Sequence, residues 1–202
     1  MRDLSLLAGI VGSDGHLEKS QPVIRIINKN KEFIRFIATL VRNLIGKIPT
    51  ITTAISGFRK QKVILVFSSK EIWETLQKKF NIPSGKKSDR IKPLNSLSNE
   101  EKIGYMLGWI AGDGSVTTDR GRVKIEIWSK SSEILRWFKE ILEENGIESR
   151  IWKSKEDDFI LRIGKKSAVQ KFHEKWEIPH PEKEKKLTKL LNDSQLSTIR
   201  TS

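Results

Sequence analysis

Leu7-Ala8-Gly9-Ile10-Val11-Gly12-Ser13-Asp14-Gly15 recurs 99 residues later as Met106-Leu107-Gly108-Trp109-Ile110-Ala111-Gly112-Asp113-Gly114. Both stretches are apolar runs threaded with small residues, and both end in Asp-Gly. Asp14 and Asp113 therefore hold the same position in two related segments of a 202-residue chain. A single Asp-Gly pair usually indicates only a turn, but two pairs at matched positions indicate a shared role. The repetition predicts two similar halves, each built around one copy.

The small residues of each stretch fall on one face of a helix, because they recur at four-residue intervals. The two trios are Ser5, Gly9 and Ser13, and Gly104, Gly108 and Gly112. Such a stripe lets two helix backbones approach closely. The other positions are mostly apolar, which is typical of a helix buried in a core, and neither run reaches the ~18 apolar residues of a membrane span. We expect the two helices, one from each half, to pack on each other.

This packing would bring Asp14 and Asp113 side by side at the C-terminal ends of their helices. The helix dipole is negative at that end, and two carboxylates held close repel each other. A hard divalent cation with oxygen ligands is the natural compensation. Gly15 and Gly114, which follow, fit a left-handed position just past a helix end.

The duplicated Leu-Ala-Gly and Asp-Gly pattern resembles the LAGLIDADG homing endonucleases in their single-chain, two-motif form, and among them intron-encoded archaeal members. The first copy matches the family motif at Leu7, Ala8, Gly9, Asp14 and Gly15. The second copy has Met106 and Leu107 in place of Leu-Ala, but it keeps Gly108, Asp113 and Gly114.

The resemblance implies a site for Mg²⁺ or Mn²⁺ made by one Asp of each motif, here Asp14 and Asp113. The backbone carbonyls of Ser13 and Gly112, which precede them, would assist. The family's polar position near the end of the second strand maps to Asn28 and Ser129. Because Ser129 is smaller, the two strand cleavages could differ.

A basic residue after Ile-Pro in the family maps to Lys87 and Lys183, where it would stabilise charge or polarise a water. Their neighbours are alternatives for this role, as are two lysines at the strand ends: Lys86, Lys185, Lys186, Lys29 and Lys130. For each lysine taken singly, a plain phosphate contact is an equally good interpretation.

The charge of the chain points to a polyanionic partner. It has 38 Lys and Arg against 25 Asp and Glu, a formal net charge of +13, and such an excess favours nucleic acid. The absence of cysteine excludes disulfides and thiolate metal sites. No signal peptide or membrane-spanning run is apparent, so we expect an intracellular protein, in the cytoplasm or nucleoid or in an organelle with the host genome, that is not secreted and makes no use of a membrane.

The elements are predicted to occur twice in the order αββαββα, an α+β fold. Residues 1–88 would form the first half, 89–97 a linker and 98–202 the second half, related by a pseudo-twofold. The two sheets would then make one saddle-shaped surface, with the motif helices as the interface. Strands are expected at 16–20, 23–28, 49–56, 62–68, 122–129, 149–153 and 159–163. Helix caps are expected at Asp3, Ser68, Ser98, Ser131 and Ser167.

Helices would cover one face of each sheet and leave the other free for a DNA major groove. Basic and polar residues gather at alternate positions on that free face. The candidate DNA contacts are His16, Glu18, Arg25, Lys29, Lys60, Lys62, Thr117, Lys124, Glu126, Lys130, Arg150 and Arg162. Trp128 and Trp152 could pack at the edge or contact bases, and we favour packing.

Two hypotheses for function follow. The first is a monomeric, site-specific endonuclease for intron homing, which hydrolyses both strands of a long, asymmetric DNA target. The second is a catalytically silent module on the same fold, such as an intron RNA maturase or a DNA-binding regulator. Two retained Asp residues favour the nuclease, because a pure binder has no need of paired carboxylates beside phosphate. An enzyme for a small anionic ligand is a more distant reading, since the chain has no Gly-rich phosphate loop.

Overall fold

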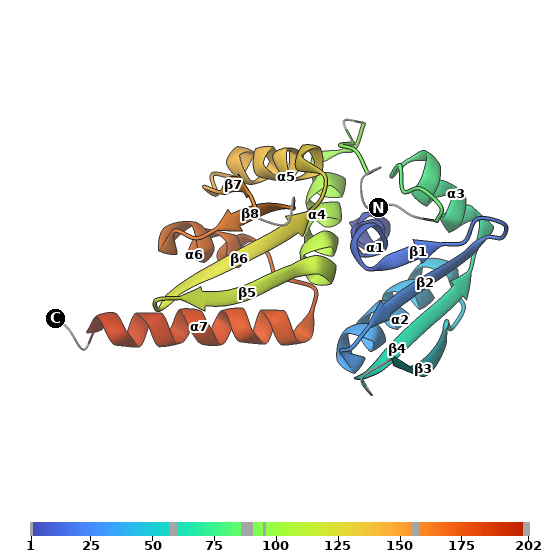
Figure 1. The fold of residues 1–202 in the computed structure, drawn as a ribbon, viewed down its shortest axis with the longest axis horizontal. Coiled ribbons are helices and arrows are strands. Elements are labelled where there is room, and N and C mark those ends of the chain that lie inside the picture. The colour runs from blue at the N-terminus through green and yellow to red at the C-terminus, as the bar shows by residue number, and fades with distance from the viewer. Residues whose placement is uncertain (1, 57–59, 86–90, 95, 155–157, 200–202) are drawn as a thin grey trace. The chain divides into compact units, whose positions relative to one another are not determined.

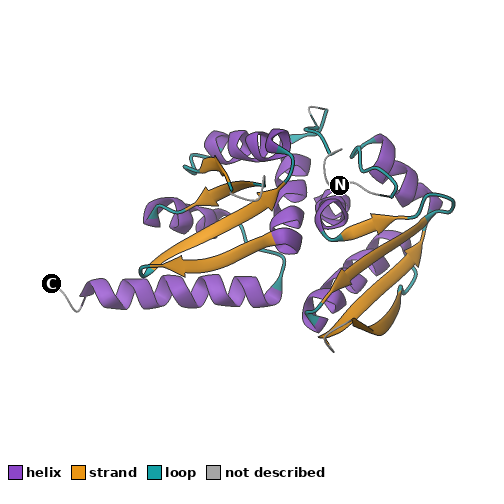
Figure 2. Cartoon of the chain, in the orientation of Figure 1, coloured by secondary structure: helices purple, strands orange, loops and turns teal. Residues whose placement is uncertain are grey.

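The computed structural model describes residues 2–56, 60–85, 91–94, 96–154 and 158–199. The first half contains α1 Arg2–Ser13, β1 Gly15–Leu17, β2 Val23–Asn28, α2 Lys31–Ile45, β3 Thr50–Ser56, β4 Lys60–Ser68 and α3 Lys70–Lys78. The second contains α4 Asn99–Asp113, β5 Gly114–Asp119, β6 Arg122–Ser129, α5 Ser132–Glu144, β7 Arg150–Lys153, β8 Phe159–Ile163 and α6 Lys166–Lys175, followed by α7 Pro181–Ile199. The order αββαββα thus occurs twice, which confirms the predicted α+β fold of two repeated halves (Figures 1 and 2).

Each half forms one four-stranded antiparallel sheet. The strand orders are β1-β2-β4-β3 and β5-β6-β8-β7, so the two sheets share one topology. By its contacts the chain divides into two compact units, Met1–Gly112 and Asp113–Ser202. The second motif helix, α4, therefore belongs to the first unit together with α1.

Helices cover one face of the first sheet. Its inward residues, among them Ile24, Ile26 and Leu65, are buried, and α2 and α3 pack on β2 and β4 (Figure 1). α2 follows Asn30, whose side chain accepts a hydrogen bond from the Phe33 backbone, and it ends at Ile45, capped by Gly46 with φ +66°. Period-two alternation sends the intervening strand residues to the opposite face.

The two motif helices pack on each other, as predicted. A Cβ on Gly9 would overlap the Tyr105 carbonyl oxygen, and a Cβ on Gly108 would overlap the Leu6 carbonyl oxygen. A Cβ on Gly112 would overlap the Ser13 hydroxyl. Gly9 and Gly108 therefore allow the two backbones to touch, and a larger residue at either position would force them apart, whereas at Gly112 the Ser13 side chain would have to move.

A capping box at the start of α4 confirms the prediction for Ser98. The Glu101 carboxylate accepts a hydrogen bond from the Ser98 backbone N–H at 3.0 Å and another from Lys79 Nζ at 2.5 Å. The Lys79 hydrogen bond holds the pKa of Glu101 below its usual range, against the opposing effect of burial. This pair connects the end of α3 to the beginning of α4.

In the second unit, α5, α6 and α7 pack on the sheet. Val123, Ile125 and Ile127 are buried, as the alternation predicts. Ser131 caps α5 by accepting a hydrogen bond from the Ile134 backbone, which is also as predicted. α7 contributes the buried residues Leu187 and Leu191.

Three predicted caps are wrong. Ser68 belongs to β4, where it pairs with Val23, and its hydroxyl donates to the Pro22 carbonyl, so Ser69 caps α3 instead. α6 begins at Lys166, one residue before Ser167, and its N-cap Lys165 makes no side-chain capping bond. α1 begins at Arg2, so Asp3 lies inside the first turn, where its charge still complements the helix dipole.

The glycines after the motifs differ from expectation as well. Gly15 and Gly114 begin β1 and β5, and neither is among the described glycines with positive φ. Gly15 is instead required by space, because a Cβ there would lie 2.6 Å from the Val11 Cα. β1 ends at Leu17, earlier than the predicted residue 20. Among the helices that the structure describes, none has the length and apolar character needed to cross a membrane.

Candidate metal-binding residues and nucleic-acid interface

Asp14 follows the last residue of α1 and is held by the neighbouring strand. Its backbone N–H donates to the Ile10 carbonyl at 2.9 Å, which continues the helical bonding by one residue. Asn28, the last residue of β2, donates from Nδ2 to Asp14 Oδ2 at 2.8 Å. The Asn28 Oδ1 atom accepts from the Asn30 backbone at 2.9 Å, which fixes the amide orientation. Asp14 is thus a half-buried carboxylate aimed by a polar partner, as suits a ligand for a hard cation.

The other predicted ligands of the first unit lie beside Asp14. A Cβ on Gly112 would come within 3.5 Å of the Asp14 Cγ, so the end of α4 lies against the end of α1. The Ser13 hydroxyl donates to the Gly9 and Ile10 carbonyls, at 3.2 and 3.1 Å, which ties that side chain to its own helix.

The second half has a different arrangement. Asp113 is the exposed last residue of α4. Ser129, at the position of Asn28, accepts a hydrogen bond from the Ser131 backbone at 3.1 Å. This bond is the counterpart of the one from Asn30 to Asn28. The serine thus reproduces the turn, but its short side chain does not supply the amide that holds the carboxylate in the first half.

The predicted lysines fall in different surroundings. Lys87 and the side chain of Lys60 lie outside the part of the chain that the structure describes. Lys183 is half-buried in the first turn of α7, and its backbone N–H donates to His180 Nδ1 at 3.4 Å. Lys29 and Lys130 are exposed beside Asn28 and Ser129. Within the described residues, no cluster of three or more His, Asp or Glu side chains could hold a metal ion.

On the free face of the first sheet, a cluster of charged side chains lies next to an apolar row. His16 and Arg25 are cross-strand partners, and Glu18 Oε1 lies 3.1 Å from the Arg25 Nε and 3.9 Å from the His16 Nε2. The next row along the strands holds Ile27 and Ile64. No role was predicted for these two isoleucines, although their positions in the strand alternation place them on the same face as Arg25.

On the second sheet, the Glu126 carboxylate contacts two basic side chains. Its Oε1 atom accepts from Arg162 Nε at 2.6 Å and lies 2.5 Å from Nη2, while Lys124 Nζ is 3.6 Å away. The Arg162 guanidinium also lies 4.2 Å over the Trp152 ring, a cation–π contact. Glu126 is therefore a buried anchor for Arg162, and Trp152 packs as expected. Trp128, by contrast, is 40% exposed.

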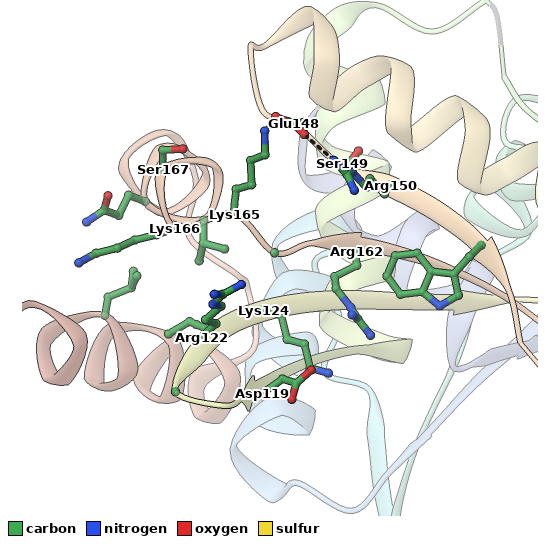
Figure 3. A pocket seen from close by; sticks show the side chains of 17 residues that line it. Asp119, Arg122, Lys124, Glu148, Ser149, Arg150, Arg162, Lys165, Lys166 and Ser167 are labelled. Carbon is green, nitrogen blue, oxygen red and sulfur yellow. Dashed lines mark hydrogen bonds and ion pairs between the residues drawn. The ribbon is translucent and has the colours of Figure 1, made fainter.

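Lys124, Arg162 and Trp152 help to line a hollow of about 1180 Å³ in the second unit, shown in Figure 3. Its basic lining residues are Arg122, Lys124, Arg150, Arg162, Lys165 and Lys166, against Asp119 and Glu148. Lys165 forms an ion pair with Glu148, with the Lys165 Nζ 2.5 Å from the Glu148 Oε2 (Figure 3). The hydrogen bond from Lys165 lowers the pKa of Glu148. The remaining basic side chains give this hollow a positive charge, so it favours the binding of an anion.

A family model described as a LAGLIDADG-like domain matches residues 2–82 and again residues 100–177. The chain belongs to the LAGLIDADG family. The two matches cover both motif helices and both sheets, and so confirm the resemblance and the duplication seen in the sequence. No curated protein sequence matches the chain.

Solved LAGLIDADG structures share the fold. A crystal structure of I-DmoI in complex with DNA and Mn superposes with a TM-score of 0.60 at 17% identity, covering 84% of this chain and 93% of that one. A structure of mesophilic variants from the homing endonuclease I-DmoI gives 0.61 at 17% identity, covering 85% and 93%. Full-length DUF199/WhiA from Thermatoga maritima gives 0.65 at 16% identity, covering 95% of this chain and 60% of that one. Identities this low show the fold alone.

Proposed function

We propose that the chain is a site-specific, double-strand DNA endonuclease of the homing type. One observation carries the proposal: an Asp stands at the C-terminal end of each motif helix, Asp14 directly after α1 and Asp113 as the last residue of α4, and Asn28 fixes the orientation of the Asp14 carboxylate through a 2.8 Å hydrogen bond. A protein that only binds nucleic acid gains nothing from an oriented carboxylate near phosphate, since the two negative charges repel. Placed beside a divalent cation, the same group becomes useful.

The donor chemistry fits Mg²⁺ or Mn²⁺. Mg²⁺ is usually held by one or two carboxylates together with waters and phosphate oxygens. Asp14 and Asp113 would supply the carboxylates, and the Ser13 and Gly112 carbonyls would assist. When bound, such a cation supplies an activated water and stabilises the leaving oxygen. The protein groups then have separate tasks: Asn28 and Ser129 order the surroundings of the two carboxylates, and Lys87 and Lys183 neutralise charge on the phosphate.

The outward faces of the sheets would bind the DNA. Antiparallel strands fit the major groove. Both sheet faces carry basic side chains that could contact DNA there: Arg25 on the first sheet, and Lys124 and Arg162 on the second. The overall charge of +13 supports the same partner. The duplicated chain already contains both halves of a site, so we further propose that it acts as a monomer inside the cell.

A second candidate is a silent intron RNA maturase or a DNA-binding regulator. It draws support from the fold match to WhiA, whose N-terminal region is described as a LAGLIDADG domain and superposes with a TM-score of 0.59. Because one fold occurs both in a homing endonuclease and in WhiA, cleavage has to be measured directly.

The test is a cleavage assay on a pool of random-sequence duplex DNA and on an intronless version of the host gene, in Mg²⁺ and separately in Mn²⁺. The variants are Asp14→Asn, Asp113→Asn and the double variant, with Asp193→Asn as control because Asp193 is an exposed Asp on α7 that belongs neither to a motif nor to the lining of the hollow. We expect double-strand cuts from wild type and Asp193→Asn, and none from the double variant. Tight binding of DNA without cleavage in either metal would contradict the endonuclease proposal and would favour the maturase or regulator.

A further inference from the structure

The free faces of the two sheets both carry an apolar row, and they differ in the row beside it. On the first sheet, Ile27, Ile64 and Thr52 lie directly across from one another on β2, β4 and β3. The neighbouring row continues from Arg25 through Val66 to Thr50. Residues opposite each other in an antiparallel sheet share a face. Ile27 is 42% exposed, Thr50 and Thr52 are exposed, and Ile64 and Val66 are half-buried.

In the second sheet the row at the position of Ile27, Ile64 and Thr52 is also apolar, and it contains Trp128, Ile160 and Trp152, of which Ile160 is buried. The row beside it is polar. Ser115, Glu126, Arg162 and Arg150 form one row across β5, β6, β8 and β7. Arg162 is held between Glu126 and Trp152, so its guanidinium is fixed before any ligand binds. Its contacts to Glu126 use the N–H of Nε and one N–H of Nη2, so that the two N–H groups of Nη1 and the second N–H of Nη2 remain for a ligand.

Base pairs differ in the major groove in ways that match this contrast. Thymine presents a C5 methyl group, which apolar side chains and threonine methyls contact, whereas guanine presents two acceptors suited to arginine. We propose that the first sheet recognises thymine methyl groups through Ile27, Ile64 and the Thr50–Thr52 edge, and that the second sheet recognises guanine through Arg162. The target would then be thymine-rich in one half and would carry a required guanine in the other. This inference rests on the proposed DNA-binding function and deepens it.

Charges around the apolar row favour DNA over a protein partner. On one side of it lie His16 and Arg25, which is paired with Glu18, and on the other lies Lys62, whose strand partner is Ala54. An apolar strip flanked by basic side chains suits a DNA groove bordered by phosphates. The basic side chains can contact the phosphates, while the strip contacts the edges of the base pairs. The strip would also distinguish DNA from RNA, since RNA contains uracil in place of thymine, and uracil lacks the C5 methyl group.

The experiment first selects tight-binding duplexes from a random DNA pool, in EDTA so that metal-dependent cutting cannot remove them. Thymines of the selected duplex are then replaced by uracil, in the wild-type complex and in Ile27→Ala/Ile64→Ala. We expect wild-type affinity to fall about fourfold for each contacted thymine, the factor for withdrawing one buried methyl group. In the isoleucine variant the same uracil replacement should change affinity less than twofold, because the methyl has lost its partner.

The matched control is Arg162→Gln on the other sheet. It should keep the full response to uracil and lose its preference at one guanine instead. If the selected duplex binds tightly and full uracil replacement leaves Kd within twofold, the inference is overturned while DNA binding stands; the apolar row would then belong to a contact with another protein or a second copy. If no duplex is selected at all, the proposed function itself fails. Because the uracil arm uses the wild-type chain, poor folding of a variant cannot imitate either result.

Discussion

At the scale of single residues, the two halves differ most at the end of the second strand, where Asn28 and Ser129 occupy matching positions. Asn28 both accepts from the Asn30 backbone and donates to Asp14. Ser129 makes the first of these bonds, from Ser131, and it lacks an amide for the second. Groups that orient a metal ligand typically change activity by 10- to 100-fold when removed.

We therefore expect Asn28→Ser to slow cleavage of one DNA strand by at least about 10-fold and to leave the other nearly unchanged. The measurement is the nicking rate of each strand, with the two strands labelled differently at their ends. Ser129→Asn is the reciprocal variant and should not slow the strand that Asn28→Ser slows. Equal slowing of both strands by Asn28→Ser would show that Asn28 supports the fold rather than one carboxylate.

The site was only partly predictable at this scale. Asp14, Asp113 and Asn28 were identifiable because repetition or the family motif marks them. The role of Glu126 was not identifiable, because its ion pair with Arg162 joins residues 36 positions apart and depends on strand register. The apolar row with Ile27 was overlooked for a related reason: an isoleucine in a strand reads as core until the covered face is known.

At the scale of secondary-structure elements, local patterns located the helices and strands well and their caps less well. Ser68 and Ser69 are adjacent, and Ser68 has Glu71 three residues later, so the capping-box pattern selects it. The structure selects Ser69 because β4 continues through Ser68 to pair with Val23, a contact 45 residues away in sequence. A cap was thus decided by sheet pairing that no local motif contains.

The glycine stripe between α1 and α4 gives the second prediction. Gly108→Ala should lower the free energy of unfolding by about 1–3 kcal/mol, the usual cost of overpacking a tight interior, although alanine is the better helix former. The Cβ would meet the Leu6 carbonyl, and backbone moves less readily than a side chain tip. Urea denaturation measures the change. Thr39→Ala, on the exposed face of α2, is the control and should stay within about 0.5 kcal/mol. A neutral Gly108→Ala would mean that the helices do not touch there.

The Glu101–Lys79 pair predicts a pH dependence. The pKa of Glu101 is lowered in the folded state, chiefly by the Lys79 hydrogen bond. A carboxyl group with a lowered folded pKa stabilises the protein above its unfolded value, here 4.5, and that stabilisation is lost as the pH falls through the folded pKa. Glu101→Gln should cost about 1.5–3 kcal/mol at pH 7, the range for a hydrogen bond to a charged group.

The cost should shrink when denaturation is measured at pH 3, on the acid side of 4.5, because the stabilisation from Glu101 is lost as the pH falls through its lowered pKa. Glu74→Gln is the comparison, because Glu74 also has a lowered pKa from its Lys78 hydrogen bond but lies on the surface. It should leave stability unchanged at both pH values, since exposed pairs contribute little. A Glu101→Gln deficit that is the same at pH 7 and pH 3 would assign the loss to packing and not to charge.

At the scale of the whole molecule, the net charge of +13 raises the question of whether DNA binding depends on total charge or on where the charges lie. Arg150 and Lys70 form a matched pair for this question. Their side chains are 77% and 83% exposed, and each lies near one carboxylate, at 3.8 and 3.9 Å. Arg150 lies on the free face of the second sheet, whereas Lys70 begins α3, on the covered face of the first.

If the faces bind DNA, Arg150→Gln should weaken binding to every sequence alike and reduce the slope of log Kd against log salt concentration by about 1, because one fewer counterion is released. Lys70→Gln removes the same charge and should leave both the affinity and the slope unchanged. The measurement is a titration of labelled duplex at several salt concentrations in EDTA. Equal effects of the two variants would mean that overall charge, acting at a distance, draws DNA to the protein. An effect of Arg150 alone locates phosphate contacts on the sheet, where the strands can also reach base edges.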